Sequence, residues 1–301
     1  MRRGIFKDIF WEDNTDNLYY GHYNILKRYS KILLPYKING ELQHGWSANS
    51  GIPSLDLKSK NESLKLKRYY VFNDNNKKKC LNAGYQNVIT IGAPFIYLED
   101  PNKFHRKQIP RSLILFPTHT HEWFGFLDPV NSYKNYIINI KKISPFFTKV
   151  TVMLGWKEYQ NKKIISLFNS ASISVMTLGH RDNNPSFLIK FIRYVSEYEY
   201  MSSDAFSSAV FYSLFIKKKV FIYGELNKKG EIWQTVKTKN KHEFYSRLYP
   251  QLLWENFDHK SHFDIADEEL GSKFKLSQEA LRKIFGWNFR AFVNRKKKTN
   301  Y

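Results

Sequence analysis

The sequence predicts an α/β fold with two Rossmann-like domains whose parallel sheets face a cleft. Short apolar segments rich in β-branched and aromatic residues alternate with amphipathic segments of about ten residues. Parallel strands need long crossover connections, which are usually helices, so this alternation is typical of parallel sheets. The length of 301 residues suits two domains of ordinary size.

Four short strands are expected in the first part of the chain, each followed by turn residues such as Gly, Pro or Asn. They cover residues 38–42, 68–72, 87–91 and 112–116. After the second strand, Asn73 and Asp74 can cap a short helix that stops near Gly84.

The same pattern continues in the second part of the chain. Helices are expected at 133–143, 156–168, 185–195 and 204–215, and strands at 149–154, 172–177, 198–201 and 220–223. We interpret residues 131–148 as a linker helix between an N-terminal domain, residues 1–130, and a C-terminal domain, residues 149–301. Beyond Gly224 the alternation is lost. A strand at 230–236 and helices at 242–254 and 277–286 either complete the second domain or cross back to the first.

The chain is strongly basic, with 48 Lys and Arg against 27 Asp and Glu, a formal net charge of +21. Such a charge favours polyanionic partners. Only 12 of the cations are Arg, the residue on which specific base readout depends, so no nucleic-acid partner is expected. Much of the excess of positive charge can be attributed to a composition that is rich in Lys, Asn and Ile. An anionic membrane surface is kept as a candidate partner.

The composition also indicates a cytoplasmic protein. A single cysteine, Cys80, excludes an intramolecular disulfide framework and a cysteine-cluster zinc site, as expected in a reducing compartment. The longest apolar stretch, about residues 208–216, is half of what a membrane-spanning helix needs. The N-terminus has acidic residues where a signal peptide would be apolar.

Ligands of parallel sheets bind where strands end, and candidate residues stand at these places. After the first strand, His44 could act as a general base or donor and Gly45 lets the backbone approach a ligand, although a histidine that caps a turn is equally compatible. After the fourth strand, His119 and His121 face opposite sides of an extended chain, so we expect one of them to contact an anionic group. A metal would need further ligands, and none is expected.

Three further motifs follow strands of the second part. His180 and Arg181 precede a helix, where a guanidinium could grip a phosphate or instead pair with Asp182 on the surface. Hydroxyls and helix N-terminal N–H groups near Ser203, Ser207 and Ser208 favour an anion site; the alternative is simple N-capping by Ser203 or Asp204. Glu225 could accept hydrogen bonds from a ribose.

Several nucleotide-binding and catalytic motifs are missing from the sequence. It has no G-x-G-x-x-G, no G-K-[ST] loop and no G-x-S-x-G elbow, which leaves a dinucleotide fold, a P-loop enzyme and an α/β-hydrolase unsupported. An Asp-x-Asp motif is also missing, which disfavours a metal-dependent sugar transferase.

The segments QHGW, GAPF, LILFPTHTH, TLGHRD with NPSFLIKFI, and SSDAFSSAVFYSLFIKKKVFIYG lie between about residues 38 and 224. In this order they resemble bacterial polysaccharide-biosynthesis proteins of capsule and lipopolysaccharide genes, with the layout of GT-B glycosyltransferases. The last segment and QHGW are similar to motifs of CDP-glycerol glycerophosphotransferases. Ser207 and Ser208 resemble the serine pair that holds the donor phosphate in bacterial GT-B sialyltransferases, but their His-Pro and Asp-Asp/Glu-Gly motifs are missing here.

The resemblance implies a metal- and cofactor-independent glycosyltransferase with a CMP-, CDP- or UDP-linked donor and a glycan or lipid-linked acceptor. The protein would be cytoplasmic and could attach peripherally to the inner membrane. The second domain would bind the donor: Ser203, Ser207 and Ser208 would hold its phosphate, His180 or Arg181 would neutralise the leaving group, and Glu225 would bind its ribose. The first domain would bind the acceptor, with His44 as general base and His119 or His121 as second choices. The alternative is a non-catalytic protein of the same fold that binds nucleotide or polyanionic glycan in an assembly complex.

Overall fold

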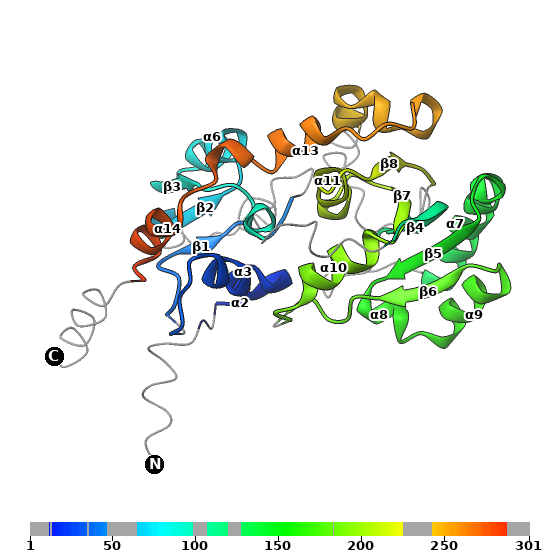
Figure 1. Cartoon of the computed structure of the whole chain (residues 1–301), viewed down its shortest axis with the longest axis horizontal. Helices are drawn as coiled ribbons and strands as arrows, with labels where there is room; N and C mark the ends of the chain where they lie inside the picture. Colours follow the sequence, from blue (N-terminus) through cyan, green and yellow to red (C-terminus); the bar gives the residue numbers. More distant parts are fainter. Residues whose placement is uncertain are drawn as a thin grey trace, which may run out of the picture.

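Two parallel β-sheets organise the chain, as the alternating pattern predicts (Figure 1). The computed structural model describes residues 12, 14–34, 36–46, 65–98, 107–119, 128–182, 184–224 and 243–287. Within them, no helix is long and apolar enough to cross a lipid bilayer.

The first sheet has three parallel strands in the order β1-β2-β3: Glu41–Leu42, Arg68–Val71 and Asn87–Thr90. Successive side chains of a strand point to opposite faces, and β2 shows this clearly. Tyr69 packs with Cys80 of α6 (Asp74–Asn82) on one face. Tyr70 packs on the other face against Phe285 of α14 (Gln278–Phe285).

The second sheet has five parallel strands in the order β6-β5-β4-β7-β8. The first of them along the chain is therefore central, the next two lie on one side and the last two on the other. This is the doubly wound order, in which the chain reverses direction between β4 and β7 and ligands bind at that switch point. The strands are β4 Ile109–Leu115, β5 Lys149–Leu154, β6 Ser174–Thr177, β7 Tyr198–Ser203 and β8 Lys219–Ile222.

Helices cover both faces of this second sheet. On one face, α7 (Pro129–Ile143) and α9 (Lys162–Ser170) pack against side chains such as Leu113. On the other, α10 (Phe187–Val195) and α11 (Ser208–Phe215) belong to the larger core. The remaining helical elements are α2 Thr15–Leu18, η1 Tyr19–Gly21, α3 His22–Tyr29, η2 Pro94–Tyr97, η4 Ser144–Phe146, α8 Trp156–Tyr159, η5 Pro250–Leu252, η6 Trp254–Asn256, α13 Phe263–Glu269 and η7 Ser272–Phe274.

The change from one sheet to the other does not fall at the expected linker, 131–148. Strand β4 lies within residues 1–130, yet it is the centre of the second sheet and pairs with β5 and β7. Helix α7 is not a connector between sheets, because Tyr133 and Tyr136 bury their rings against that same sheet. The described chain passes between sheets after β3 and before β4. The strand–helix pattern looks alike on both sides of this point, so it predicts elements without predicting which strands pair.

The C-terminal helices cross back to the first sheet, one of the two possibilities left open by the sequence. Ala93 N donates to Leu270 O at 2.8 Å, and Arg68 Nη1 donates to Ile284 O at 2.8 Å. Assigning all of residues 149–301 to the second domain therefore does not describe their packing. The expected strand at 230–236 lies outside the described residues.

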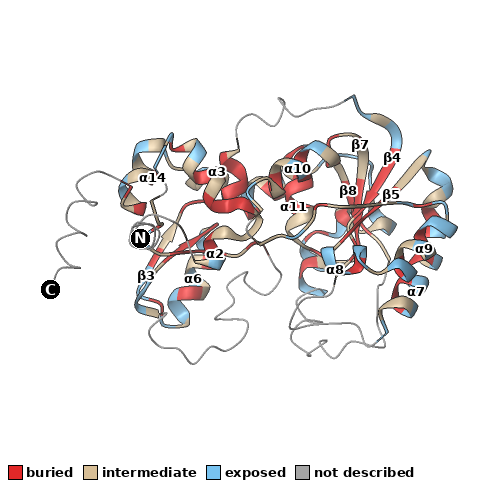
Figure 2. Ribbon diagram, turned by 90° about the horizontal axis from the view of Figure 1, so that it is seen from below, coloured by how far each residue is buried: buried red, intermediate tan, exposed pale blue. Residues whose placement is uncertain are grey.

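A single hydrophobic cluster of buried side chains runs from the first sheet to the second. It includes Tyr70 and Phe72 at the first sheet and Met201 and Phe211 at the second. Figure 2 shows buried residues concentrated in the strands of the second sheet and in the helices α3, α10 and α11 between the sheets. The two sheets thus share one core.

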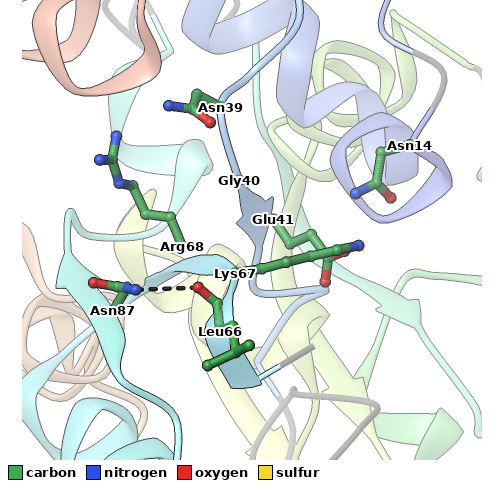
Figure 3. A pocket seen from close by; sticks show the side chains of 8 residues that line it. All are labelled: Asn14, Asn39, Gly40, Glu41, Leu66, Lys67, Arg68 and Asn87. Carbon is green, nitrogen blue, oxygen red and sulfur yellow. Dashed lines mark hydrogen bonds and ion pairs between the residues drawn. The ribbon is translucent and has the colours of Figure 1, made fainter. Parts of the chain in front are cut away.

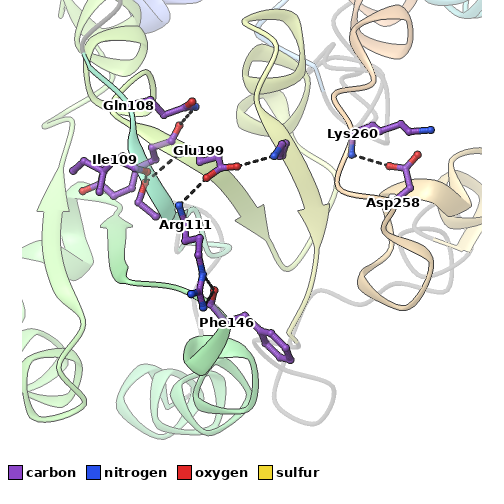
Figure 4. A network of polar contacts seen from close by, with 10 residues as sticks. Gln108, Ile109, Arg111, Phe146, Glu199, Asp258 and Lys260 are labelled. Atoms are coloured by element: carbon purple, nitrogen blue, oxygen red, sulfur yellow. Dashed lines mark hydrogen bonds and ion pairs between the residues drawn. The ribbon is translucent and has the colours of Figure 1, made fainter.

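A polar network fixes the amino-terminal edge of the second sheet (Figure 4). Glu199 accepts a hydrogen bond from Arg111 N at 2.7 Å and pairs with Lys219 at 2.6 Å. The Arg111 guanidinium donates to Phe146 O. Burial opposes ionisation of Glu199, but the bonds from Lys219 and Arg111 prevail and lower its pKa. The candidate site lies at the opposite edge, at the carboxyl ends of the strands.

Candidate functional site

Two motifs that lie 162 residues apart meet at the carboxyl ends of the two sheets. The Ser208 hydroxyl, at the start of α11, accepts a hydrogen bond from Trp46 N and donates one to Trp46 O, each at 3.0 Å. A Cβ atom on Gly45 would lie only 2.9 Å from Ser208 Oγ, so this close approach favours glycine. The loop after β1 is therefore held directly against the loop after β7.

His44, in the same loop, lies against two tyrosine rings. Its ring centroid is 4.1 Å from that of Tyr19 in an edge-on contact. The Tyr20 hydroxyl is 3.4 Å from His44 Nε2, within reach of a weak hydrogen bond. His44 as a whole is half-buried, and its imidazole lies against these two aromatic rings.

Arg181 approaches the same two tyrosines from the loop after β6. Its guanidinium lies over the Tyr19 ring, 5.1 Å from the centroid, and its side chain hydrogen-bonds Tyr20. Its Nε is 3.3 Å from Asp182 Oδ1, so the surface ion pair considered from the sequence is also present. Burial alone would lower the pKa of Arg181, but Tyr20 and Asp182 raise it. A fixed positive charge thus stands beside the His44 group.

The backbone of Tyr20 is held in the left-handed region, with φ of 57° and ψ of 9°. This is unusual for a bulky residue and carries strain. Tyr20 N donates to Arg181 O at 3.0 Å, and a Cβ on Gly21 would lie 2.8 Å from Pro185 O. The loop that carries Arg181 therefore holds the tyrosine turn in place. Sequence reasoning missed Tyr19 and Tyr20, since they precede a helix it did not predict.

The three candidate serines have different surroundings. Ser203 is buried and donates to Phe116 O at 2.7 Å, which ties β7 to the end of β4. Ser208 is engaged by Trp46. Ser207 is the N-cap residue of α11, but its side chain makes no capping hydrogen bond. Asp204 is not the N-cap residue of α11, and its Oδ1 accepts a hydrogen bond from Thr118 N at 2.6 Å. Of the three serine hydroxyls, that of Ser207 is the least engaged in hydrogen bonds with the rest of the described protein.

His119 belongs to a second group, at the switch point of the second sheet. A Cβ on Gly155, after β5, would lie 2.9 Å from His119 Cβ and 2.5 Å from the buried Glu158 carboxylate. The Tyr133 hydroxyl donates to Thr118 O at 3.1 Å. Burial, with Glu158 and Asp204 nearby, raises the pKa of Tyr133, which remains protonated.

His180 is half exposed, and its Nδ1 accepts from Asp182 N at 3.2 Å. It flanks Arg181 in the chain, and its hydrogen bond and ion-pair contact are with Asp182 and not with the tyrosine pair. His121 and Glu225 lie outside the described residues. Where the chain is described, no three His, Cys, Asp or Glu side chains are grouped to hold a metal.

A separate cavity of about 490 Å³ opens at the other, amino-terminal end of the first sheet (Figure 3). Several polar side chains in it already bond to one another or to the backbone. Lys67 Nζ is 2.8 Å from Glu41 Oε1, and Arg68 donates to a carbonyl of α14. The cavity lies away from the carboxyl ends, and we assign it no ligand.

Comparison of the chain with protein-family models, with curated proteins and with solved structures found no match. The functional assignment below is therefore argued from the motifs and the geometry alone.

Proposed function

We propose that the protein is a metal-independent glycosyltransferase of bacterial surface polysaccharide biosynthesis. It would transfer a sugar, or a related unit, from a CMP-, CDP- or UDP-activated donor to a glycan or lipid-linked acceptor in the cytoplasm. The observation that carries the proposal is the meeting of His44 with Arg181 and the start of α11 at the carboxyl ends of both sheets. Doubly wound sheets bind nucleotides at this edge, beside the switch point.

The donor phosphate would lie at the start of α11. The Ser207 hydroxyl and the first N–H groups of the helix are suited to an anion, and the helix dipole adds to the attraction. Arg181 would neutralise charge on the leaving phosphate, with His180 beside it. Ser203 and Ser208 would act by fixing the two loops. Glu225 would bind the ribose.

The acceptor would be activated from the first sheet. His44 would take the proton of the acceptor hydroxyl as its oxygen attacks the anomeric carbon of the donor. The bond from that carbon to the phosphate oxygen breaks, and the nucleotide leaves with the electron pair. Fixed positive groups stabilise this developing charge, so the step does not depend on a metal ion. The histidines of the 119–121 segment are the second choice of base.

A GT-B arrangement of the two sheets is part of the proposal. It is supported by the parallel order of both sheets and by the return of α13 and α14 to the first sheet. Closure of two lobes would exclude water from the donor.

The continuous core between the sheets favours a second candidate. The two lobes share buried side chains, and the Ser203 and Ser208 hydroxyls are hydrogen-bonded to the backbone. Such a chain is also suited to binding a ligand without turnover. This candidate is a non-catalytic protein that holds nucleotide or polyanionic glycan in an assembly complex.

The test begins with thermal unfolding in the presence of CMP, CDP, UDP, GDP and ADP, with and without EDTA. A ligand at about 100 times its dissociation constant adds about 2.7 kcal/mol, which shifts the unfolding temperature measurably. We expect one nucleotide to stabilise the protein whether or not EDTA is present. The shift should be lost in Ser207→Ala and Arg181→Ala and kept in the exposed controls Ser166→Ala and Arg193→Ala.

Turnover separates the two candidates. With the matching donor and an acceptor extract, the enzyme should release nucleotide, and His44→Ala should bind nucleotide but release none. Binding without release in the unaltered chain would favour the assembly protein. If no nucleotide raised the unfolding temperature, the proposals of a transferase and of a nucleotide-binding assembly protein would both be contradicted. Polyanionic glycan would then be the ligand to test.

A further inference from the structure

The turn that joins α3 to β1 exposes two adjacent leucines. Leu33 is 93% exposed and Leu34 is 53% exposed, and Leu33 is the most exposed large apolar side chain in the described part of the chain. Single exposed leucines are common on protein surfaces. Two in succession form an apolar projection that a partner could cover, and the neighbouring charges indicate which kind of partner.

The backbone of this turn is well anchored. Helix α3 ends in a Schellman motif: Ile32 N donates to Lys27 O at 3.1 Å and Lys31 N to Arg28 O at 3.0 Å, with Lys31 at a φ of 53°. Further along, Tyr36 O accepts from the Tyr23 hydroxyl at 3.0 Å. Lys37 O accepts from Trp287 Nε1 at 3.1 Å. Backbone hydrogen bonds before and after the two leucines therefore fix their position on the surface.

Positive charges flank the exposed leucines along the chain. Between Asn17 and Gly40 the sequence has no carboxylate and four cations, which are Lys27, Arg28, Lys31 and Lys37. Lys275 adds a fifth, with its Nζ 5.4 Å from the centroid of the Tyr29 ring at the end of α3. The carboxylate of Glu12 lies nearby but accepts hydrogen bonds from Ile38 N and the Asn17 amide.

We propose that the Leu33 turn, the described residues 27–34, 36 and 37, docks on an anionic lipid bilayer. Leu33 and Leu34 would enter the boundary between head groups and acyl chains, and the flanking cations would contact lipid phosphates. A second copy of this chain is a poorer occupant, since it would bring the same positive charges into contact. This inference does not depend on the transfer reaction, because a chain that binds no nucleotide could still dock.

The turn and the candidate site lie at opposite ends of one short helix. Helix α3 starts directly after Tyr20 and Gly21 and is eight residues long, which is about 12 Å. Under the proposed function, docking would bring the site close to a bilayer that holds a lipid-linked acceptor.

Sedimentation with lipid vesicles tests the proposal. We expect the protein to sediment with vesicles of phosphatidylcholine and phosphatidylglycerol in roughly equal parts, but not with phosphatidylcholine alone, and to be released by salt. Leu33→Ser with Leu34→Ser should lower the partition coefficient about tenfold or more. Lys31→Glu should lower it about fivefold or more.

The control is Leu81→Ser. Leu81 is 46% exposed beside Lys77, Lys78 and Lys79 on α6, which covers the other face of the first sheet from α14. It should bind vesicles as the unaltered protein does, which would show that the effect belongs to the Leu33 turn.

Equal binding by the double leucine variant and the unaltered protein would overturn the proposal, as would an equal loss in Leu81→Ser. A second result would also overturn it: the unaltered chain is a dimer that does not bind vesicles, and the double leucine variant is a monomer. The turn would then be a protein–protein interface. Unfolding temperature and nucleotide-induced shift should stay unchanged in the double variant, which separates this result from failure of the proposed function.

Discussion

Trp46 and Glu269 are joined by a short buried hydrogen bond, 2.6 Å from the indole Nε1 to Oε2. The other carboxylate oxygen, Oε1, accepts from the Tyr249 hydroxyl at 2.7 Å. One carboxylate therefore connects the loop after β1, the segment before η5 and the end of α13. It also fixes the side chain of the residue whose backbone is held by Ser208.

Removal of this carboxylate should destabilise the fold. Glu269→Ala would leave the indole N–H and the Tyr249 hydroxyl without an acceptor, and each such buried donor costs about 1–3 kcal/mol. We expect the free energy of unfolding in urea to fall by about 2–5 kcal/mol, and by less in Glu269→Gln, which keeps one acceptor. Glu268→Gln, on the exposed side of the same helix, is the control and should change little. An unchanged urea midpoint for Glu269→Ala would contradict the assigned network.

The second prediction concerns Tyr20 as a positioning residue for His44. Tyr20→Phe removes the hydroxyl that is 3.4 Å from His44 Nε2 and bonds the Arg181 side chain. We expect it to lower turnover about tenfold, and His44→Ala to lower it about 100-fold or more. Because the hydroxyl acts through His44, the double variant should be no slower than His44→Ala alone. Fully additive losses, measured as kcat, would show that Tyr20 acts independently of His44.

The third prediction uses the strained end of α3. Lys31 occupies the left-handed position that normally favours glycine, so Lys31→Gly should stabilise the protein by about 1 kcal/mol. Urea unfolding measures this, and Lys27→Gly, inside the same helix, should instead destabilise by about 1 kcal/mol. Stabilisation by both substitutions would mean that loss of charge, and not backbone strain, is responsible.

The strands were more predictable than their pairing. Lys149–Leu154 was predicted with its observed bounds because an apolar β-branched run between turn residues has few other uses. The central place of β4 could not be predicted, since it depends on pairing with strands that are distant in the sequence. Leu115 pairs with Val152, 37 residues further on, and with Ser202, 87 residues further on, and neither pairing leaves a local signal. The helix predicted at 204–215 starts only at Ser208, with Ser207 as its N-cap residue, and Asp204 instead accepts a hydrogen bond from Thr118 N, 86 residues earlier in the chain.

The candidate site was predictable in its residue types and not in its partners. His44, Arg181 and Ser208 were singled out because they follow strands, and the structure brings their loops together. The connecting tyrosines, Tyr19 and Tyr20, lie in a left-handed turn that only tertiary contacts stabilise, so no sequence pattern marked them.

The last prediction rests on His22, at the start of α3. It is fully buried, and within the described residues neither ring nitrogen has a hydrogen-bond partner. Burial lowers its pKa to about 3, so the folded protein holds it neutral. The unfolded chain takes up a proton below about pH 6.5 and the folded one only below about pH 3. The stabilising effect of the neutral ring is therefore complete above pH 6.5 and is lost as the pH falls toward 3.

The free energy of unfolding should accordingly fall by up to about 1.4 kcal/mol per pH unit through His22. Urea unfolding between pH 7 and 5 measures this, above the range where the carboxylate of Glu199, with its lowered pKa, is protonated. His22→Phe should flatten the dependence and raise stability at pH 7, because it removes two buried nitrogens that lack partners. His180→Phe, at a half-exposed position, should leave the slope of the unaltered protein in place. If the slope survives in His22→Phe, another group carries it, and the imidazole of His22 is hydrated or hydrogen-bonded in solution.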